Sequence, residues 1–468
     1  MIGLLSVGVY FMRKNSTTDD YFVSGRNMSK WHIGLSVVAT DVGGGFSIGL
    51  GGLGFMIGMS GSWMLFTGLI GAWLAAVLLI PRVYGLGSER KFLTFPQLFG
   101  HFYDRRVALV AGVISLIGYL GFTSSQILAG AKLASAAVGM DLHTALLIMG
   151  SVTIVYTVLG GMNAVIHTDT IQWAVLIGGL LFIGLPIAWN AVGGWQEVKR
   201  AVEPEMLSFT NLELSTFINW AVTIIPIWFV GMTLYQRIYA TRSEKDAKKA
   251  WFIAGLFEWP VMAFLGVVLG LLARVAAEQG MFLAEFPGGA ESMDSEMGLP
   301  VLLRSILPVG LMGVMLSVYF SAILSTADSC LMAASGNLLT DVIGKRGRPH
   351  DMKFQLRLSQ LFTLLLGAIA LALAAVMENV LSLMLHSYAF MVSGLLVPLI
   401  AAVFFGQRNA PAALVAMIAG GGTTIALTTS GVVLPAGLDA NIFGISVAVI
   451  ASIIVARLVP IKMEKKWN

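Results

Sequence analysis

Charged side chains are scarce in this chain of 468 residues: Asp, Glu, Lys and Arg make up 12% of it, and hydrophobic residues make up 57%. A soluble domain carries about 25% charged residues. Mean hydropathy is +0.83, and uninterrupted apolar runs such as 173–189 and 364–377 recur along the chain. Because no water-soluble fold buries so much apolar surface, the sequence predicts an all-α polytopic membrane protein. It excludes soluble enzymes, nucleic-acid binders and secreted disulfide-rich domains.

Cysteine and the usual catalytic motifs are also missing. Cys330 is the single cysteine, so it forms no disulfide within the chain. Gly49, Gly51 and Gly54 match a dinucleotide-binding pattern, but they lie inside an apolar span with no preceding strand. The six histidines show no metal-ligand spacing. We therefore expect no enzyme activity, no cofactor, no nucleic-acid partner and no obligate protein partner.

Apolar segments of suitable length set the predicted topology. A helix crosses the roughly 30 Å hydrocarbon core of a bilayer with about 20 residues. The sequence predicts thirteen membrane helices, the first of them only partial, at 1–12, 31–58, 62–86, 106–138, 143–160, 161–190, 214–240, 247–277, 306–343, 355–377, 379–405, 411–432 and 440–459.

The basic residues set the predicted orientation. Of the 29 Lys and Arg residues, 24 fall in or beside loops on one side of this topology, and Arg237 is counted among them. The opposite loops are acidic. The other five basic residues are Lys132, Lys199, Arg200, Arg274 and Arg304. The positive-inside rule then predicts a multi-pass protein of the plasma (inner) membrane, with its N-terminus outside and its C-terminus in the cytoplasm.

Two blocks of five spans, 31–190 and 214–405, show matching interruptions. The first span of one block contains three glycines at 43–45, and that of the other contains Pro226 and Gly231. Because each block has an odd number of spans, five, the second block is inverted in the membrane relative to the first. Broken first helices at matching places are typical of the binding site of an inverted-repeat transporter. The alternative is that these glycines only allow close helix packing. The remaining segments are a partial first helix and cytoplasmic loop at 1–30, an extracellular linker at 191–213, and two accessory helices with a cytoplasmic tail at 406–468.

Four ionisable residues fall at membrane depth, where such groups indicate function: Asp41, Asp169, Glu258 and Asp328. Asp41 adjoins the glycine break, where a carboxylate and freed carbonyls suit a small cation; its alternative is to cap the broken helix. The alternative for Asp169 is an interfacial carboxylate that reaches water. Glu258 is compatible with a proton site and equally with a structural partner for a basic residue.

Hydroxyl groups gather in the span 306–343. Ala322, Ser325 and Thr326 are spaced i, i+3, i+4 and share one helix face. Oxygens on this face are candidates to complete a sodium shell, and Asp328 and Ser329 continue around the same helix. The alternative is that small residues here only tighten helix packing.

Several stretches, taken together in their order and spacing, resemble the sodium:solute symporters, the group of the sodium/proline, sodium/glucose, sodium/sialic-acid and choline carriers. The resemblance runs from Asp20 to about Phe405. Its most specific stretches are 156–161, 168–172, Gln236-Arg237 with Ala240, and 321–329. It implies the leucine-transporter fold, whose inverted five-helix repeats match the two blocks.

The resemblance also implies where ions bind. The main sodium site, with sodium as the only metal, is formed by carbonyls of the first broken helix and by the eighth core helix: Ala39, Val42, Ala322, Ser325 and Thr326. Asp41 matches a carboxylate tied to sodium coupling in the proline carrier. Asp169 matches one near a second sodium site, where Ser325, Asp328 and Ser329 fall here. Asp328 replaces a serine of the sialic-acid carrier, so a stoichiometry of one or two sodium ions stays open.

The resemblance places a solute pocket between the broken helices and the long third core helix, at Gly43, Gly44, Phe122, Ile224 and Trp228. Phe122 and Trp228 fall where the proline carrier has tyrosines, and their alternative is ordinary helix packing or lipid contact. These expectations describe a sodium-coupled symporter that imports a small organic solute, an amino acid or similar zwitterion, by alternating access across the bilayer. The alternatives are a sodium-coupled carrier of choline-like or organic-acid solutes, a transport-like sensor and a channel.

Overall fold

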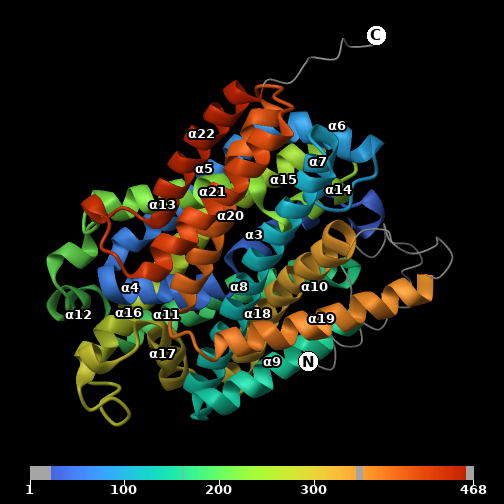
Figure 1. The fold of residues 1–468 in the computed structure, drawn as a ribbon. Coiled ribbons are helices and arrows are strands. Elements are labelled where there is room, and N and C mark those ends of the chain that lie inside the picture. The colour runs from blue at the N-terminus through green and yellow to red at the C-terminus, as the bar shows by residue number, and fades with distance from the viewer. Residues whose placement is uncertain (1–22, 161, 344–351, 460–468) are drawn as a thin grey trace.

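The computed structural model describes residues 23–160, 162–343 and 352–459. In these ranges every long element is a helix, and the single pairing of extended backbone is an isolated bridge between Met28 and Thr241. Figure 1 shows the helices packed against one another along most of their length. The prediction of an all-α protein is confirmed for this part of the chain.

Twenty helices make up most of the described chain. Those of the first half are α3 (Lys30–Gly44), α4 (Gly51–Ile57), α5 (Trp63–Leu74), α6 (Ile80–Glu89), α7 (Pro96–Phe102), α8 (Arg105–Val138), α9 (Leu142–Gly160), α10 (Met162–Gly179), α11 (Leu185–Ala191) and α12 (Gly194–Ala201). Those of the second half are α13 (Leu214–Val230), α14 (Met232–Ala240), α15 (Glu244–Leu256), α16 (Ala263–Glu278), α17 (Gly298–Ile306), α18 (Val309–Asn337), α19 (Met352–Ala374), α20 (Val380–Val403), α21 (Ala410–Ser430) and α22 (Ala440–Leu458). Asp104 caps α8 by accepting hydrogen bonds from the N–H groups of Arg106 and Val107 at 2.8 and 3.0 Å.

The predicted count of thirteen membrane helices is not confirmed. Among the described residues, nine helical stretches are long and apolar enough to cross a membrane, or ten if the bent pair α13 and α14 counts as one span. Residues 1–12 lie outside the described residues, and 142–158 is a shorter apolar helix. The predicted span 62–86 and the last part of the predicted span 31–58 lie in one stretch, Ile48–Glu89, because the segment Gly58–Ser62 between them is itself helical.

Two of the long helices are interrupted where the sequence predicts it. Gly43 has φ 42° and ψ −130°, a conformation that side-chain-bearing residues rarely adopt, and it interrupts the regular turns of α3. Gly231 has ψ 117° and separates α13 from α14, which are bent by 43°. Pro226 lies inside α13 without ending it. The broken helices are thus observed, whereas the division into inverted repeats at 31–190 and 214–405 stays a prediction.

The two longest helices, α8 and α18, pack against each other through the middle of the molecule (Figure 1). Helix α8 also contacts α9, α19 and α20, and α18 also contacts α3 and α10. Helices α21 and α22 pair beside α20, while α9 and α19 lie side by side at the opposite edge (Figure 1). This arrangement brings the break in α3 next to the hydroxyl-bearing part of α18.

The five basic residues outside the main basic loops find partners among acidic residues or aromatic rings. Four form ion pairs: Lys132 with Asp294 and Glu296, Arg200 with Glu197, Arg274 with Glu278 and Glu291, and Arg304 with Glu285. Lys199 Nζ lies 5.6 Å from the centre of the Trp195 ring. The ion pairs of Lys132, Arg274 and Arg304 tie the acidic loops to neighbouring helices, whereas the contacts of Lys199 and Arg200 lie within α12. Which side of the membrane they face stays a prediction.

Candidate functional site

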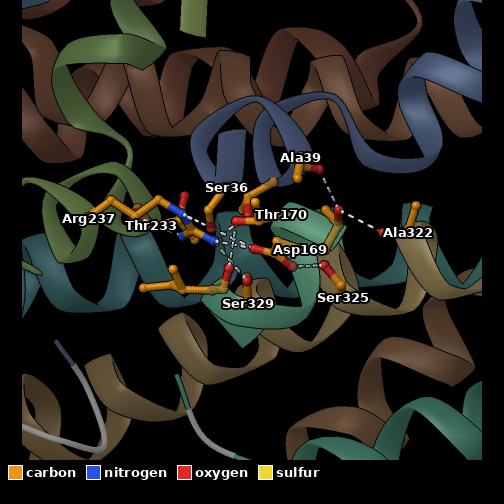
Figure 2. Close-up of polar contacts among 12 residues, drawn as sticks. Ser36, Ala39, Asp169, Thr170, Thr233, Arg237, Ala322, Ser325 and Ser329 are labelled. Carbon is orange, nitrogen blue, oxygen red and sulfur yellow. Dashed lines mark hydrogen bonds and ion pairs between the residues drawn. The ribbon is translucent and has the colours of Figure 1, made fainter. Parts of the chain in front are cut away.

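The break in α3 touches α18 through one hydroxyl group. Thr326 Oγ1 lies 2.9 Å from Ala39 O and 3.3 Å from Ala322 O, so its single hydrogen is shared between two carbonyl acceptors (Figure 2). A Cβ added to Gly43 would lie 2.7 Å from Thr326 Oγ1. The helices approach so closely because Gly43 has no side chain.

Oxygen atoms dominate this contact. It joins the backbone carbonyls of Ala39 and Ala322 to the hydroxyl of Thr326, a residue that is 0% exposed. The preceding residue on α18, Ser325, is 3% exposed. Carbonyls of unwound helix segments are suited to coordinating small monovalent cations in transporters. Of the five residues predicted for the main sodium site, the structure joins Ala39, Ala322 and Thr326, whereas the Ser325 hydroxyl donates to Asp169. The side chains of Asp41 and Val42 lie outside the described part of the chain.

Asp169 of α10 is completely buried beside this contact. Ser325 Oγ donates to Asp169 Oδ1, and Ser36 Oγ donates to Asp169 Oδ2 at 2.6 Å. Arg237 Nη2 lies 3.4 Å from the same Oδ2 atom. Figure 2 shows the three side chains converging on the carboxylate. A carboxylate without exposed surface does not reach water, so the interfacial alternative for Asp169 is wrong.

Arg237 belongs to this cluster and not to a basic loop, which corrects the assignment made from sequence. Its side chain is 0% exposed. It donates from Nε to Ser36 Oγ at 3.0 Å, from Nη1 to Thr233 O at 3.2 Å, and from Nη2 to Thr40 Oγ1 and Ser329 Oγ. Arg237 lies near the end of the predicted span 214–240, and the positive-inside rule counts an arginine at such a position as a loop charge.

Asp328 and Ser329 follow the sodium-site residues on α18, and both are buried. Ser329 Oγ accepts from Arg237 Nη2 at 3.3 Å. Asp328 Oδ1 lies within hydrogen-bond distance of Thr157 Oγ1 on α9, a residue that the sequence did not single out as a site residue. The two neighbours therefore contact different elements, α14 and α9.

Gln126 of α8 is a further site residue that sequence reasoning missed. Its side chain is fully buried, and its Oε1 accepts a hydrogen bond from the N–H of Gly44 at 2.6 Å. Because Gly43 breaks the helix, Gly44 depends on partners outside the regular helical ladder. The available signal was a glutamine at the end of a polar run, Thr123 to Gln126, inside an apolar span.

The predicted pocket residues Phe122 and Trp228 pack against different helices. Phe122 is buried on α8, and its ring meets the Tyr388 ring of α20 edge to face at 5.0 Å. Trp228 is also buried, but its ring meets Trp251 of α15, with the ring centres 6.4 Å apart. A Cβ on Gly71 of α5 would lie 2.4 Å from Trp228 Cδ1. The described contacts of Trp228 are thus helix packing, whereas Phe122 lies on the same helix as Gln126.

The remaining two candidates are also buried. Ile224 on α13 is 4% exposed. Glu258 is 0% exposed, and a Cβ on Gly68 of α5 would lie 2.0 Å from its Oε2. Glu258 thus packs against α5, and the structural alternative for it stays open. No group of three or more His, Cys, Asp or Glu suited to a metal ion is found among the described residues.

Known proteins share sequence with most of this chain. A family model described as the sodium:solute symporter family matches residues 21–420. The chain is 27% identical over 441 residues to sodium/glucose cotransporter 1 of Sus scrofa, covering 86% of this chain and 65% of that protein. It is also 27% identical over 442 residues to the high-affinity proline transporter PutP of Bacillus subtilis (strain 168), covering 92% and 90%.

Solved structures give the fold. A sodium-coupled sialic acid symporter, in a substrate-bound outward-open state, superposes with a TM-score of 0.76 at 21% identity, covering 98% of this chain and 96% of that one. Mhp1, a nucleobase-cation-symport-1 family transporter, has a TM-score of 0.60 at 14% identity, covering 96% and 98%. The fold is therefore of the leucine-transporter type found in sodium symporters. With the family model matching most of its length, the chain belongs to the sodium:solute symporter family, whose members are membrane-spanning transporters coupled to sodium.

Proposed function

We propose that this protein is a sodium-coupled secondary active symporter that imports a small organic solute, an amino acid or a similar zwitterion, by alternating access. The observation that carries the proposal is the contact of Thr326 Oγ1 with Ala39 O at 2.9 Å. This contact joins the break in α3 to α18. A sodium ion bound between them would hold the two helices together and so link ion binding to the shape of the solute pocket.

The proposed sodium ligands are the carbonyls of Ala39, Val42 and Ala322 with the hydroxyls of Ser325 and Thr326. When the ion binds, the Thr326 hydroxyl turns its hydrogen away and offers a lone pair instead. Asp41, next to the break, contributes negative charge that couples sodium to the pocket. The sodium gradient and the membrane potential make the transport inward. The basic loops predict that the C-terminus lies in the cytoplasm, at the plasma (inner) membrane.

The proposed pocket lies at Gly43, Gly44, Phe122, Ile224 and Trp228. The match to PutP, which covers 90% of that protein, supports an amino acid as the first solute to test. One sodium ion crossing with the membrane potential contributes about 2.3 kcal/mol per 100 mV. That free energy sustains a gradient of about 50-fold for a neutral solute.

The substitution Thr326→Ala tests the sodium site. Removing one oxygen that contacts an ion costs about 1.5–3 kcal/mol, by analogy with hydrogen bonds to charged groups, so the half-saturating sodium concentration should rise about tenfold or more. The measurement is uptake of labelled L-proline into proteoliposomes against external sodium, with glucose, sialic acid and choline as comparison solutes.

Ser317→Ala is the matched control. Ser317 lies on the same helix and donates to the carbonyl four residues before it, at 2.7 Å, but its hydroxyl is exposed. Its removal should leave the sodium dependence unchanged. If both variants keep the half-saturating sodium concentration of the unmodified protein, the proposed site is refuted. Uptake that does not respond to sodium for any of the solutes would refute the symporter itself.

A further inference from the structure

Both carboxylate oxygens of Asp169 are already engaged by internal donors. Oδ1 accepts from the hydroxyl of Ser325, and Oδ2 accepts from Ser36 at 2.6 Å and faces Arg237 Nη2 at 3.4 Å. Asp169 and Arg237 are 0% exposed. Three of the roughly four lone-pair positions of this carboxylate are thus directed at hydrogen atoms of the protein.

Arg237 is held in place by four helices. It starts from α14 and bonds to Ser36 and Thr40 on α3, to Asp169 on α10 and to Ser329 on α18 (Figure 2). Its Nη1 also returns to Thr233 O at 3.2 Å. A guanidinium keeps its charge at any physiological pH. The side chain is therefore a permanent positive charge fixed beside Asp169.

A fixed cation and a mobile one compete for the same carboxylate. Two positive charges a few ångströms apart repel strongly away from water, and burial weakens the screening that would relieve this. The Thr326 contact differs, because its partners are the backbone carbonyls of Ala39 and Ala322. The electrostatics therefore favour sodium binding at Thr326 and disfavour it at Asp169, beside Arg237.

We propose that Arg237 is the built-in counter-cation of Asp169 and limits this protein to one sodium ion per transport cycle. The inference rests on the proposed function, and it deepens it by fixing the ion stoichiometry. Arg237 acts here through Asp169, as a positioning and charge-setting residue. Asp328 is not part of this pair, because its described partner is Thr157.

Sodium binding to the purified protein tests the proposal. Equilibrium binding of radioactive ²²Na⁺ should saturate at one ion per chain for the unmodified protein. In Arg237→Gln, the Asp169 carboxylate and the Ser329 hydroxyl lose their positively charged partner, so binding should rise to two ions per chain. The double variant Asp169→Asn with Arg237→Gln should return to one.

Arg274→Gln is the matched control, since Arg274 also forms ion pairs, with Glu278 and Glu291, but on the acidic loop side; it should bind one ion. Two ions bound by the unmodified protein would overturn the inference even if the Arg237 variant does not fold. So would one ion bound by a folded Arg237→Gln protein. No saturable sodium binding at all would count against the proposed symport itself, which keeps the two failures distinguishable.

Discussion

Lys132→Met is expected to lower the free energy of unfolding by about 3–5 kcal/mol, the cost of leaving a buried charge without its partner. Lys132 Nζ lies 2.6 Å from Glu296 Oε2 and 2.6 Å from Asp294 Oδ2. The side chains of Lys132 and Glu296 are 3% and 2% exposed. Without the ammonium group, the Glu296 carboxylate stays buried with only neutral donors.

Glu296 also caps the start of α20, which increases the expected loss of stability in Lys132→Met. Its two oxygens accept hydrogen bonds from the N–H groups of Val380 and Leu381 at 2.9 and 3.0 Å, at the start of α20. A carboxylate at a helix N-terminus satisfies unpaired backbone donors and the helix dipole. Lys132 therefore connects α8, the loop before α17 and the first turn of α20.

Unfolding of the purified protein in mixed detergent micelles, followed by denaturant titration, measures the effect. The control is Lys199→Met, since Lys199 is exposed and contacts only the Trp195 ring among the described interactions; a change below about 0.5 kcal/mol is expected there. The double variant Lys132→Met with Glu296→Gln should recover part of the loss, because it removes the unpaired charge. Equal stability of the Lys132 and Lys199 variants would show that the buried pair contributes nothing.

Gly270→Ala is expected to cost about 3 kcal/mol or more, at the upper end of the range for overpacked interiors. A Cβ at Gly270 would lie 2.0 Å from Gly51 O, and one at Gly54 would lie 2.1 Å from Val267 O. The obstacles are backbone atoms, which no rotamer change moves. The substitution must therefore push α4 and α16 apart, and α4 is the continuation of the first broken helix.

Gly313→Ala supplies the control for this substitution. Gly313 lies in α18, and no atom lies within 4 Å of the Cβ that alanine would add. Alanine favours helix over glycine by about 1 kcal/mol, so this variant should be neutral or more stable. The same unfolding titration compares the two proteins. A Gly270→Ala protein as stable as the Gly313→Ala protein would contradict the close approach of α4 and α16.

The sequence alone was enough to predict a helical membrane protein, the family and the two helix breaks. Apolar run length reports membrane helices directly, because a bilayer demands about 20 apolar residues per span. The break at Gly43 followed from a run of glycines, and the hydroxyl face of Ser325 and Thr326 followed from helical spacing. The number of spans did not follow, since Gly58–Ser62 continues as a helical turn between two predicted spans.

Tertiary structure alone decided which charges are paired. Asp169 and Arg237 are 68 residues apart in the chain, and Lys132 and Glu296 are 164 apart. Spacing along one helix reports which residues share a face, but not which residue of another helix meets that face. From the sequence alone, Arg237 was therefore counted as a loop charge.

What the sequence by itself determined is the class of protein: its apolar content requires a bilayer, and its glycines, hydroxyls and carboxylates fall where a broken-helix transporter needs them. Only the tertiary structure decided which polar groups of the site are partners. Arg237 balances the charge of Asp169, and the Thr326 hydroxyl donates to Ala39 O. The physical reason is that composition and periodicity are local properties of the chain, whereas the energy of a buried charge depends on its neighbours in space.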